Sequence, residues 1–260
     1  MALFTQHEYT DAESGLTVPY NLYLPEGYNE NETYPLMIFV ADSSVNSDEV
    51  TDPLAQDGAA VWATAEEQAK HPCIVLVPQY TTSLVNEIGM LTTDTHEWND
   101  GLTLMKNLFD YIIESYSVDE SRIYGTGQSQ GGMMTIAISD KYPDFYTAQY
   151  LVACQWDAQE MAAMADDKLW ITVCEGDFKA YPGMNASVAV WEDMGVPVVK
   201  NDTMWDSAAS AEDLNTLAED MATQDGNIHY TVFAEGNHMG TWKFAYDIEA
   251  IRDWLFAQTK

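Results

Sequence analysis

Basic residues are rare in this chain, and their shortage excludes two classes of partner. Only 10 Lys and Arg stand against 42 Asp and Glu in 260 residues, which gives a formal net charge of −32. Nucleic acids and anionic membranes are bound through basic patches, so we expect this chain to bind neither. The acidic excess fits a salt-rich or acidic extracellular habitat, but a plain effect on solubility is the simpler interpretation.

Cysteine is equally scarce. The three residues Cys73, Cys154 and Cys174 leave at least one thiol unpaired, and none has the spacing of zinc ligands. A disulfide-rich scaffold is therefore excluded. Cys154 and Cys174 each lie in a strand-like run and could be close in space, but buried thiols that pack as small apolar side chains are the favoured interpretation.

Long apolar runs are also missing. The longest, such as residues 36–41, are far shorter than the roughly 20 residues that cross a bilayer. Residues 1–7 lack the basic segment and apolar stretch of a secretory signal. We expect a soluble chain, and its location inside or outside the cell stays open.

The chain does contain enough apolar mass for a large core. Hydrophobic residues make up 47% of it, including 8 Trp, 15 Tyr and 8 Phe. Aromatic side chains bury large areas, which argues against disorder. Since α/β folds of this length commonly form one unit, we expect a single domain over residues 1–260.

Two hydrophobic patterns predict strands. Residues 16–24 alternate apolar and polar, as expected of a half-buried strand at an antiparallel edge. Later runs are apolar throughout, which favours parallel strands buried on both faces. These runs cover residues 36–41, 73–77, 122–125, 150–154, 169–174 and 228–233.

Helical patterns lie between the strand-like runs. The clearest is an apolar stripe over residues 102–116, and a last pattern over residues 244–255 predicts one closing helix. The alternation of strand and helix predicts an α/β fold with a mostly parallel sheet, an antiparallel N-terminal edge and helices on both faces.

The segment Gly127-Gln128-Ser129-Gln130-Gly131 carries the main functional signal. A serine with glycine at both second neighbours, between a strand-like run and a helical pattern, is typical of a nucleophile elbow. The chain turns so sharply there that larger side chains at the glycine positions would collide. The sequence therefore predicts a serine hydrolase with Ser129 as its nucleophile.

An acid and a base are expected after the nucleophile, because successive strands deliver their loops to one edge of the sheet. Asp177 follows the run 169–174 and is the preferred acid, while Glu175 and Asp157 compete with it. His238 is the preferred base, since it alone of five histidines follows a late strand-like run.

The other histidines are assigned to the surface or to packing, because three precede the serine and the fourth starts a strand at its far end. They are His7, His71, His96 and His229. A group of acidic residues and one histidine before residue 102 could be taken as a metal cluster. It is better explained as the negatively charged start of a helix, so no metal is expected. Its members are Asp94, His96, Glu97 and Asp100.

These residues predict acyl transfer in two steps. His238 takes the proton of Ser129, Asp177 orients the imidazole and stabilises its cation, and water hydrolyses the acyl-enzyme. The oxyanion is expected to be held by the backbone N–H of Gln130 and by one N–H after residues 36–41, where Ser43 is the best position.

Four groups of residues match the motifs of a known family. They are residues 122–132, Gln155-Trp156-Asp157, Glu175-Gly176-Asp177 with Tyr181-Pro182-Gly183-Met184, and Gly236-Asn237-His238 followed by Thr241-Trp242. In these motifs the chain resembles bacterial α/β-hydrolase esterases related to feruloyl esterases and polyhydroxybutyrate depolymerases, some of whose relatives are labelled predicted peptidases. The resemblance covers nearly the whole chain. It implies the α/β-hydrolase fold, the same triad, and no metal or organic cofactor.

One loop departs from the family pattern. Similar enzymes often carry His-Gly after the third strand, where this chain has Ala41-Asp42 before Ser43. An anionic Asp42 aimed inward would oppose the negative charge that develops on the substrate. Its carboxylate is therefore expected to point to solvent.

The substrate is less constrained. Only residues 158–168 separate two strand-like runs where many lipases insert a lid, so no large lid is expected, and the segment 181–227 could form one wall. Trp156 and Trp205 are candidate substrate-binding residues, although packing is the commoner role of such side chains.

The sequence thus predicts a serine carboxylesterase acting on small-molecule esters of short-chain or aromatic, feruloyl-like type. A serine peptidase of the same fold and a catalytically silent binding protein remain alternatives, because fold alone does not fix function. The chain is too short for the propeller domain of prolyl oligopeptidases, which disfavours the peptidase. The oligomeric state stays open.

Overall fold

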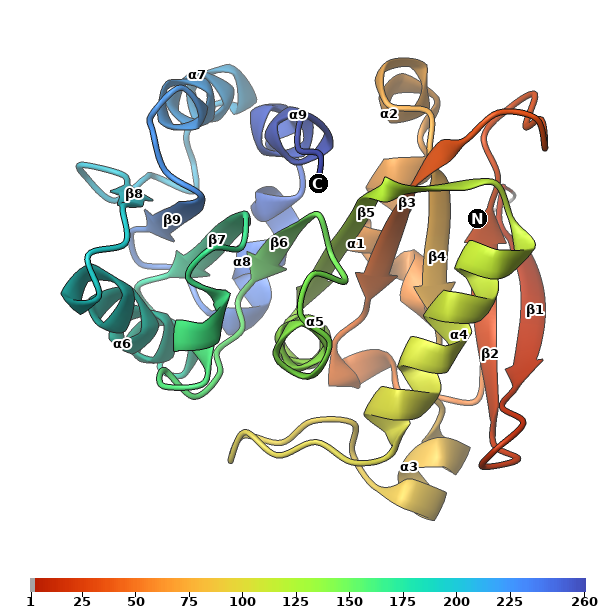
Figure 1. Ribbon diagram of the computed structural model, residues 1–260. Coiled ribbons are helices and arrows are strands. Elements are labelled where there is room, and N and C mark those ends of the chain that lie inside the picture. Colours follow the sequence, from red (N-terminus) through yellow and green to blue (C-terminus); the bar gives the residue numbers. More distant parts are fainter. Residues whose placement is uncertain (1–2) are drawn as a thin grey trace.

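One mixed sheet of nine strands runs through residues 3–260, the part of the chain that the computed structural model describes. The strands are β1 (Thr5–Thr10), β2 (Thr17–Tyr23), β3 (Tyr34–Val40), β4 (Ile74–Pro78), β5 (Val118–Gln128), β6 (Ala148–Val152), β7 (Leu169–Cys174), β8 (Val198–Lys200) and β9 (Ile228–Phe233). Their order across the sheet is β1-β2-β4-β3-β5-β6-β7-β9-β8 (Figure 1). β2 pairs antiparallel with β1 and with β4, and the other pairings in the described sheet are parallel. The predicted mixed sheet with its antiparallel N-terminal edge is confirmed.

Two strands were not predicted. β1 is polar and mostly exposed, because it forms the outer edge of the sheet, so it shows no apolar alternation. β8 has three residues, too few to carry a pattern. The strand expected at the edge, β2, therefore lies one place inside it.

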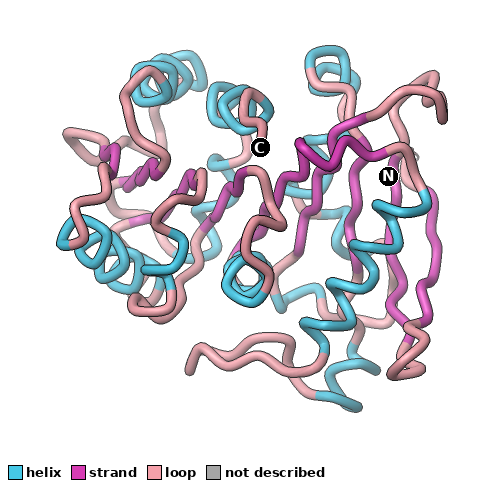
Figure 2. The backbone as a smooth tube through the Cα atoms, in the orientation of Figure 1, coloured by secondary structure: helices cyan, strands magenta, loops and turns pink. Residues whose placement is uncertain are grey.

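Helices cover both faces of the sheet (Figures 1 and 2). They are α1 (Asp57–Ala60), α2 (Ala65–Lys70), α3 (Thr82–Ile88), α4 (Gly101–Ser115), α5 (Gln130–Lys141), α6 (Ala180–Asp193), α7 (Ala211–Ala222), α8 (His238–Ala245) and α9 (Glu249–Phe256), with short 3₁₀ turns at Ser43–Val45, Asp52–Ala55, Val61–Ala63 and Met161–Met164. Side chains alternate along β3, as a strand dictates. Leu36 and Ile38 join the core of α4, α5 and α6, whereas Met37 and Phe39 join the core of α1, α8 and α9.

The closing helix is broken in two. α8 ends at Ala245, and Ile248 has extended backbone (φ −76°, ψ 99°) immediately before α9. The apolar spacing continues through the break because Ile248, Ile251 and Leu255 all pack in the same core. Periodicity alone therefore predicted the packed face but not the interruption.

A carboxyl group far from the C-terminal strand ends makes stability depend on pH. Burial and the charges of Asp144 and Asp166 raise the pKa of Asp167 from its usual 3.8 to about 6, although a hydrogen bond from Gln149 opposes them. A raised folded-state pKa gives stability that is complete below the unfolded pKa and is lost as pH rises through about 6.

Asp167→Asn is accordingly expected to raise the free energy of unfolding at pH 8. The gain should be on the order of 2 kcal/mol, which is less than the full pKa shift would give, because the side chain is partly solvated. The gain should disappear below about pH 4, where the wild-type carboxyl is also neutral. Denaturant unfolding at the two pH values checks this, with the exposed Asp202→Asn as baseline. An equal gain at both pH values would contradict the assignment to titration.

Candidate active site

Ser129 lies at a sharp turn between β5 and α5. Its backbone has φ 50° and ψ −121°, a conformation that side chains rarely adopt, and α5 begins at the next residue. A Cβ atom on Gly127 would lie 2.5 Å from the carbonyl carbon of Gly131, and one on Gly131 would lie 1.9 Å from the carbonyl oxygen of Val40. Glycine at both positions is therefore required by backbone contacts, which is the geometry of a nucleophile elbow.

Gly131→Ala is expected to cost about 3 kcal/mol or more, which lowers Tm by roughly 6–12 °C, because the new methyl group meets backbone that cannot move aside. Thermal unfolding of the variant checks this. Gly226→Ala is the milder comparison, since its Cβ would lie 3.0 Å from the Val199 side chain and no closer than 3.3 Å to any backbone atom. A Gly131→Ala protein that unfolds at the wild-type temperature would show that the elbow is less tight than described.

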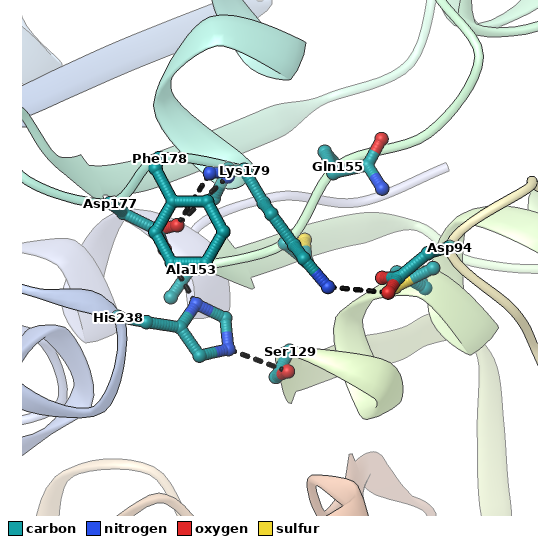
Figure 3. A pocket seen from close by; sticks show the side chains of 11 residues that line it. Asp94, Ser129, Ala153, Gln155, Asp177, Phe178, Lys179 and His238 are labelled. Atoms are coloured by element: carbon teal, nitrogen blue, oxygen red, sulfur yellow. Dashed lines mark hydrogen bonds and ion pairs between the residues drawn. The ribbon is translucent and has the colours of Figure 1, made fainter.

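Three side chains from separate loops meet at the C-terminal ends of the parallel strands. Ser129 and Asp177 follow β5 and β7, and His238 follows β9 as the first residue of α8. His238 Nε2 lies 2.8 Å from Ser129 Oγ, and His238 Nδ1 lies 2.5 Å from Asp177 Oδ2 (Figure 3). These two contacts, made in this order, are those of a serine–histidine–aspartate triad.

The Asp177 carboxylate is buried, and both of its oxygens have hydrogen-bond partners. It is 1% exposed, and its second oxygen accepts the backbone N–H groups of Lys179 and Ala180, each at 3.0 Å. Burial alone would raise the pKa of Asp177, but the bonds with His238 and with these two N–H groups hold that pKa below its usual range. The group therefore stays ionised, as needed to stabilise an imidazolium.

The competing acids do not reach His238. Asp157 accepts backbone N–H groups of its own turn, from Gln159 and Glu160. Glu175 is exposed and accepts the backbone N–H of Glu235. Of the three carboxylates considered, only Asp177 is brought to the imidazole.

The other histidines lie away from Ser129. His229 is buried against Trp170, and burial lowers its pKa to about 4, so it stays neutral. His71 pairs with Asp253, and His7 contacts Thr5. His96 is the exception to a purely surface role, because it binds Gln155 at the edge of the site at 2.5 Å.

The two positions expected to hold an oxyanion, Gln130 and Ser43, belong to different elements that line the same hollow. Gln130 is the first residue of α5, and Ser43 is the first residue of the 3₁₀ turn after β3, so neither N–H has a partner within its own helix. Both residues line a hollow that also contains Ser129 and His238. Their placement is that of oxyanion donors, a role that stays a proposal.

The expectation that Asp42 points to solvent is wrong. Its side chain is 4% exposed, and its carboxylate accepts Gln128 Nε2 at 2.8 Å, Gln56 Nε2 at 2.6 Å and the Ser44 N–H at 2.8 Å. These donors compensate the anion for lost water. Asp42 thus ties the loop that carries Ser43 to the residue before the nucleophile.

Two hollows meet at Ser129. The inner hollow, of about 150 Å³, is partly open and mostly apolar, and the outer hollow, of about 400 Å³, is more open and mostly polar. Five residues line both: Asp94, Ser129, Met133, Lys179 and His238. The inner hollow adds Ala153, Cys154, Gln155, Asp177, Phe178 and Ala180 (Figure 3), and the outer one adds Ser43, Met90, Thr92, Thr93 and Gln130.

Neither tryptophan proposed for substrate lines these hollows. Trp156 is 1% exposed and donates its indole N–H to Glu160, and Trp205 is 4% exposed and packs edge-on against Phe233. Both side chains pack in the core, the role that the sequence favoured for them, and neither is brought to the hollows beside Ser129. The exposed aromatic at the site is instead Phe178, directly after Asp177 and 80% exposed.

Lys179 and Asp94 were also missed as site residues. They form an ion pair beside Ser129 (Figure 3). The position of Lys179, two residues after the acid, was a usable signal, but nothing in the sequence pairs it with a residue 85 positions earlier. The acidic group before α4 is therefore divided: Asp100 lies at the helix start, whereas Asp94 and His96 reach the site.

All three thiols are buried and free in the described chain, and burial raises the pKa of Cys154 and Cys174, so Cys154 is a neutral part of the inner hollow. Across residues 3–260, three His, Cys, Asp or Glu side chains nowhere converge as metal ligands would. Within the same range, no helix has the length and apolar character that a bilayer span needs.

Comparisons with known proteins find esterases. A family model described as "Putative esterase" matches residues 13–251. Acetylxylan esterase A of Emericella nidulans is 23% identical over 121 residues, which is 40% of this chain and 40% of that enzyme.

Solved structures show the same fold. One titled as a thermostable esterase superposes with a TM-score of 0.80 at 22% identity, covering 100% of this chain and 64% of that one. A feruloyl esterase module of Clostridium thermocellum, in complex with sinapinate, gives a TM-score of 0.61 at 14% identity, with 97% and 87% coverage. This chain therefore spans less than two thirds of the acetylxylan esterase and of the thermostable esterase, although it covers most of the feruloyl esterase module.

Proposed function

We propose that this chain, which belongs to the esterase family whose model matches residues 13–251, hydrolyses carboxylic esters through an acyl-enzyme formed on Ser129. The observation that carries the proposal is the continuous chain of contacts from Ser129 Oγ to His238 and from His238 to Asp177. Acyl transfer by a serine requires a hydroxyl that contacts an imidazole and an imidazole that contacts a buried carboxylate, in this order.

The reaction follows from these contacts. Neutral His238 takes the Ser129 proton through Nε2 as Oγ attacks the ester carbonyl, and Asp177 stabilises the imidazolium. The N–H groups of Gln130 and Ser43 hold the negative oxygen. The alcohol leaves with the proton from His238, and a water activated by the same imidazole then hydrolyses the acyl-enzyme.

The shapes of the hollows support short acyl groups. The inner hollow has about 150 Å³, a volume that in other proteins takes one benzene ring, so it suits a short acyl chain or a small aromatic one. The larger, polar outer hollow suits a hydroxyl-rich alcohol, such as the sugar of an acylated polysaccharide. We assign the acyl group to the inner hollow because an acyl group is a short chain with a free end, which a small hollow can hold. A polymeric alcohol, by contrast, must continue into solvent.

The direct test joins chemical labelling to a substrate panel. A fluorophosphonate probe should label the peptide that contains Ser129. The values of kcat/KM should fall in the order p-nitrophenyl acetate or butyrate, then methyl ferulate, then a peptide amide. Faster cleavage of the amide than of the esters would favour the peptidase. Labelling of another peptide would show that Ser129 is not the nucleophile. A protein that is neither labelled nor active on any of these substrates would be a silent binding protein.

A further inference from the structure

The Lys179–Asp94 ion pair lies at the boundary between the two hollows. Both residues line both hollows, together with the reacting groups Ser129 and His238. In Figure 3 the Lys179 side chain extends from beside Phe178, over the site, to the Asp94 carboxylate. No other lysine or arginine lines either hollow in the described part of the chain.

Asp94 belongs to the 89–100 loop, which connects α3 to α4 and is held to the site at two further points. Gln130 Nε2 donates to the carbonyl oxygen of Thr92 at 3.1 Å, and His96 binds Gln155 at 2.5 Å. The loop is thus anchored beside Ser129 from the elbow and from the segment after β6. Asp94, between these anchors, is presented to Lys179.

The Lys179–Asp94 ion pair is weaker than the contacts that hold the surrounding backbone. Its side chains are 48% and 64% exposed, and exposed ion pairs contribute little and are screened by salt. By contrast, the backbone of Lys179 is fixed, because its N–H donates to Asp177. The Lys179 side chain can therefore swing away without disturbing the acid.

We propose that the Lys179–Asp94 ion pair is a partition that limits the length of the acyl group in the inner hollow. This inference rests on the proposed esterase function and adds a specificity determinant to it. With the pair closed, the inner hollow ends at the Lys179 side chain. With the pair broken, the two hollows join, and longer acyl chains can extend along Met133, the apolar side chain that lines both hollows.

The measured quantity is the ratio of kcat/KM for p-nitrophenyl hexanoate to that for p-nitrophenyl acetate, because the shared leaving group cancels. Each methylene fully taken out of water is worth about fourfold in rate, so two more methylenes would give up to about 16-fold, and about five- to tenfold when they are only partly buried in the joined hollow. Lys179→Ala, Lys179→Met and Asp94→Ala should each raise the ratio by about five- to tenfold. In the wild type the ratio should also rise with salt concentration, and in the variants it should not.

Lys200→Ala is the matched control, because it breaks the exposed Lys200–Glu192 pair, which lines neither hollow. An unchanged ratio in all three site variants would overturn the partition. A rise in Lys179→Ala alone would mean that side-chain bulk, and not the ion pair, sets the limit. An equal fall for both esters would mean that the pair supports Asp177 instead.

The failure of the proposed function looks different. If the wild type is neither labelled by fluorophosphonate nor active on either ester, the esterase proposal fails, and the partition falls with it. If the wild type is labelled and active but the ratio does not change, only the partition is wrong.

Discussion

Replacing Ser129 by alanine is expected to lower kcat for ester hydrolysis by at least about 10³-fold, and by as much as about 10⁶-fold. The hydroxyl is the only group of the triad that forms a bond to the substrate, and His238 lies 2.8 Å away to take its proton. Alanine keeps the Cβ atom, so the turn at φ 50° is unchanged and folding should be preserved. Steady-state kinetics and circular dichroism of the purified variant check both points.

The same experiment shows whether the groups act as a unit. The double variant Ser129→Ala with His238→Ala should lose little more than Ser129→Ala alone, because the base has no proton to take once the hydroxyl is gone. Ser139→Ala, a buried serine later in α5, is the matched control and should retain wild-type kcat. Multiplying losses in the double variant, or residual labelling of Ser129→Ala, would remove Ser129 from its assigned role.

Asp177→Asn is expected to lower kcat by about 10⁴-fold while leaving the fold intact. The amide oxygen can still accept the N–H groups of Lys179 and Ala180, so the loop keeps its bonds. The amide nitrogen would instead face His238 Nδ1 as a donor. This contact selects the imidazole tautomer with its hydrogen on Nε2, which cannot accept the proton of Ser129.

The control variants for this prediction are the two acids that competed with Asp177 in the sequence. Asp157→Asn and Glu175→Gln should retain wild-type kcat, because neither carboxylate contacts His238. A loss of comparable size in either control would show that the assigned acid is wrong. The values of kcat and KM should be measured separately. Loss of the Asp177–His238 contact lowers kcat, whereas displacement of the loop that carries Asp177 also raises KM.

Much of the fold was predictable because its signals are local. Strands buried on both faces must be apolar throughout, and the runs at residues 36–41, 169–174 and 228–233 all form central strands. The edge strands β1 and β8 gave no such signal, since an edge needs little apolar burial. The break at Ile248 was hidden for the opposite reason, because both helices bury the same face.

Within the site, the sequence by itself determined the elbow and a short set of candidate partners for a serine nucleophile. Gly127 and Gly131 are fixed by contacts a few residues away or with the adjacent strand, and chain order leaves few choices for the acid and base. The inward turn of Asp42, the burial of Trp156 and Trp205, and the pairing of Lys179 with Asp94 were decided only by the tertiary structure. The physical reason is that local sterics are set by neighbours in the sequence, whereas burial and charge pairing depend on which distant segments the packed sheet brings together.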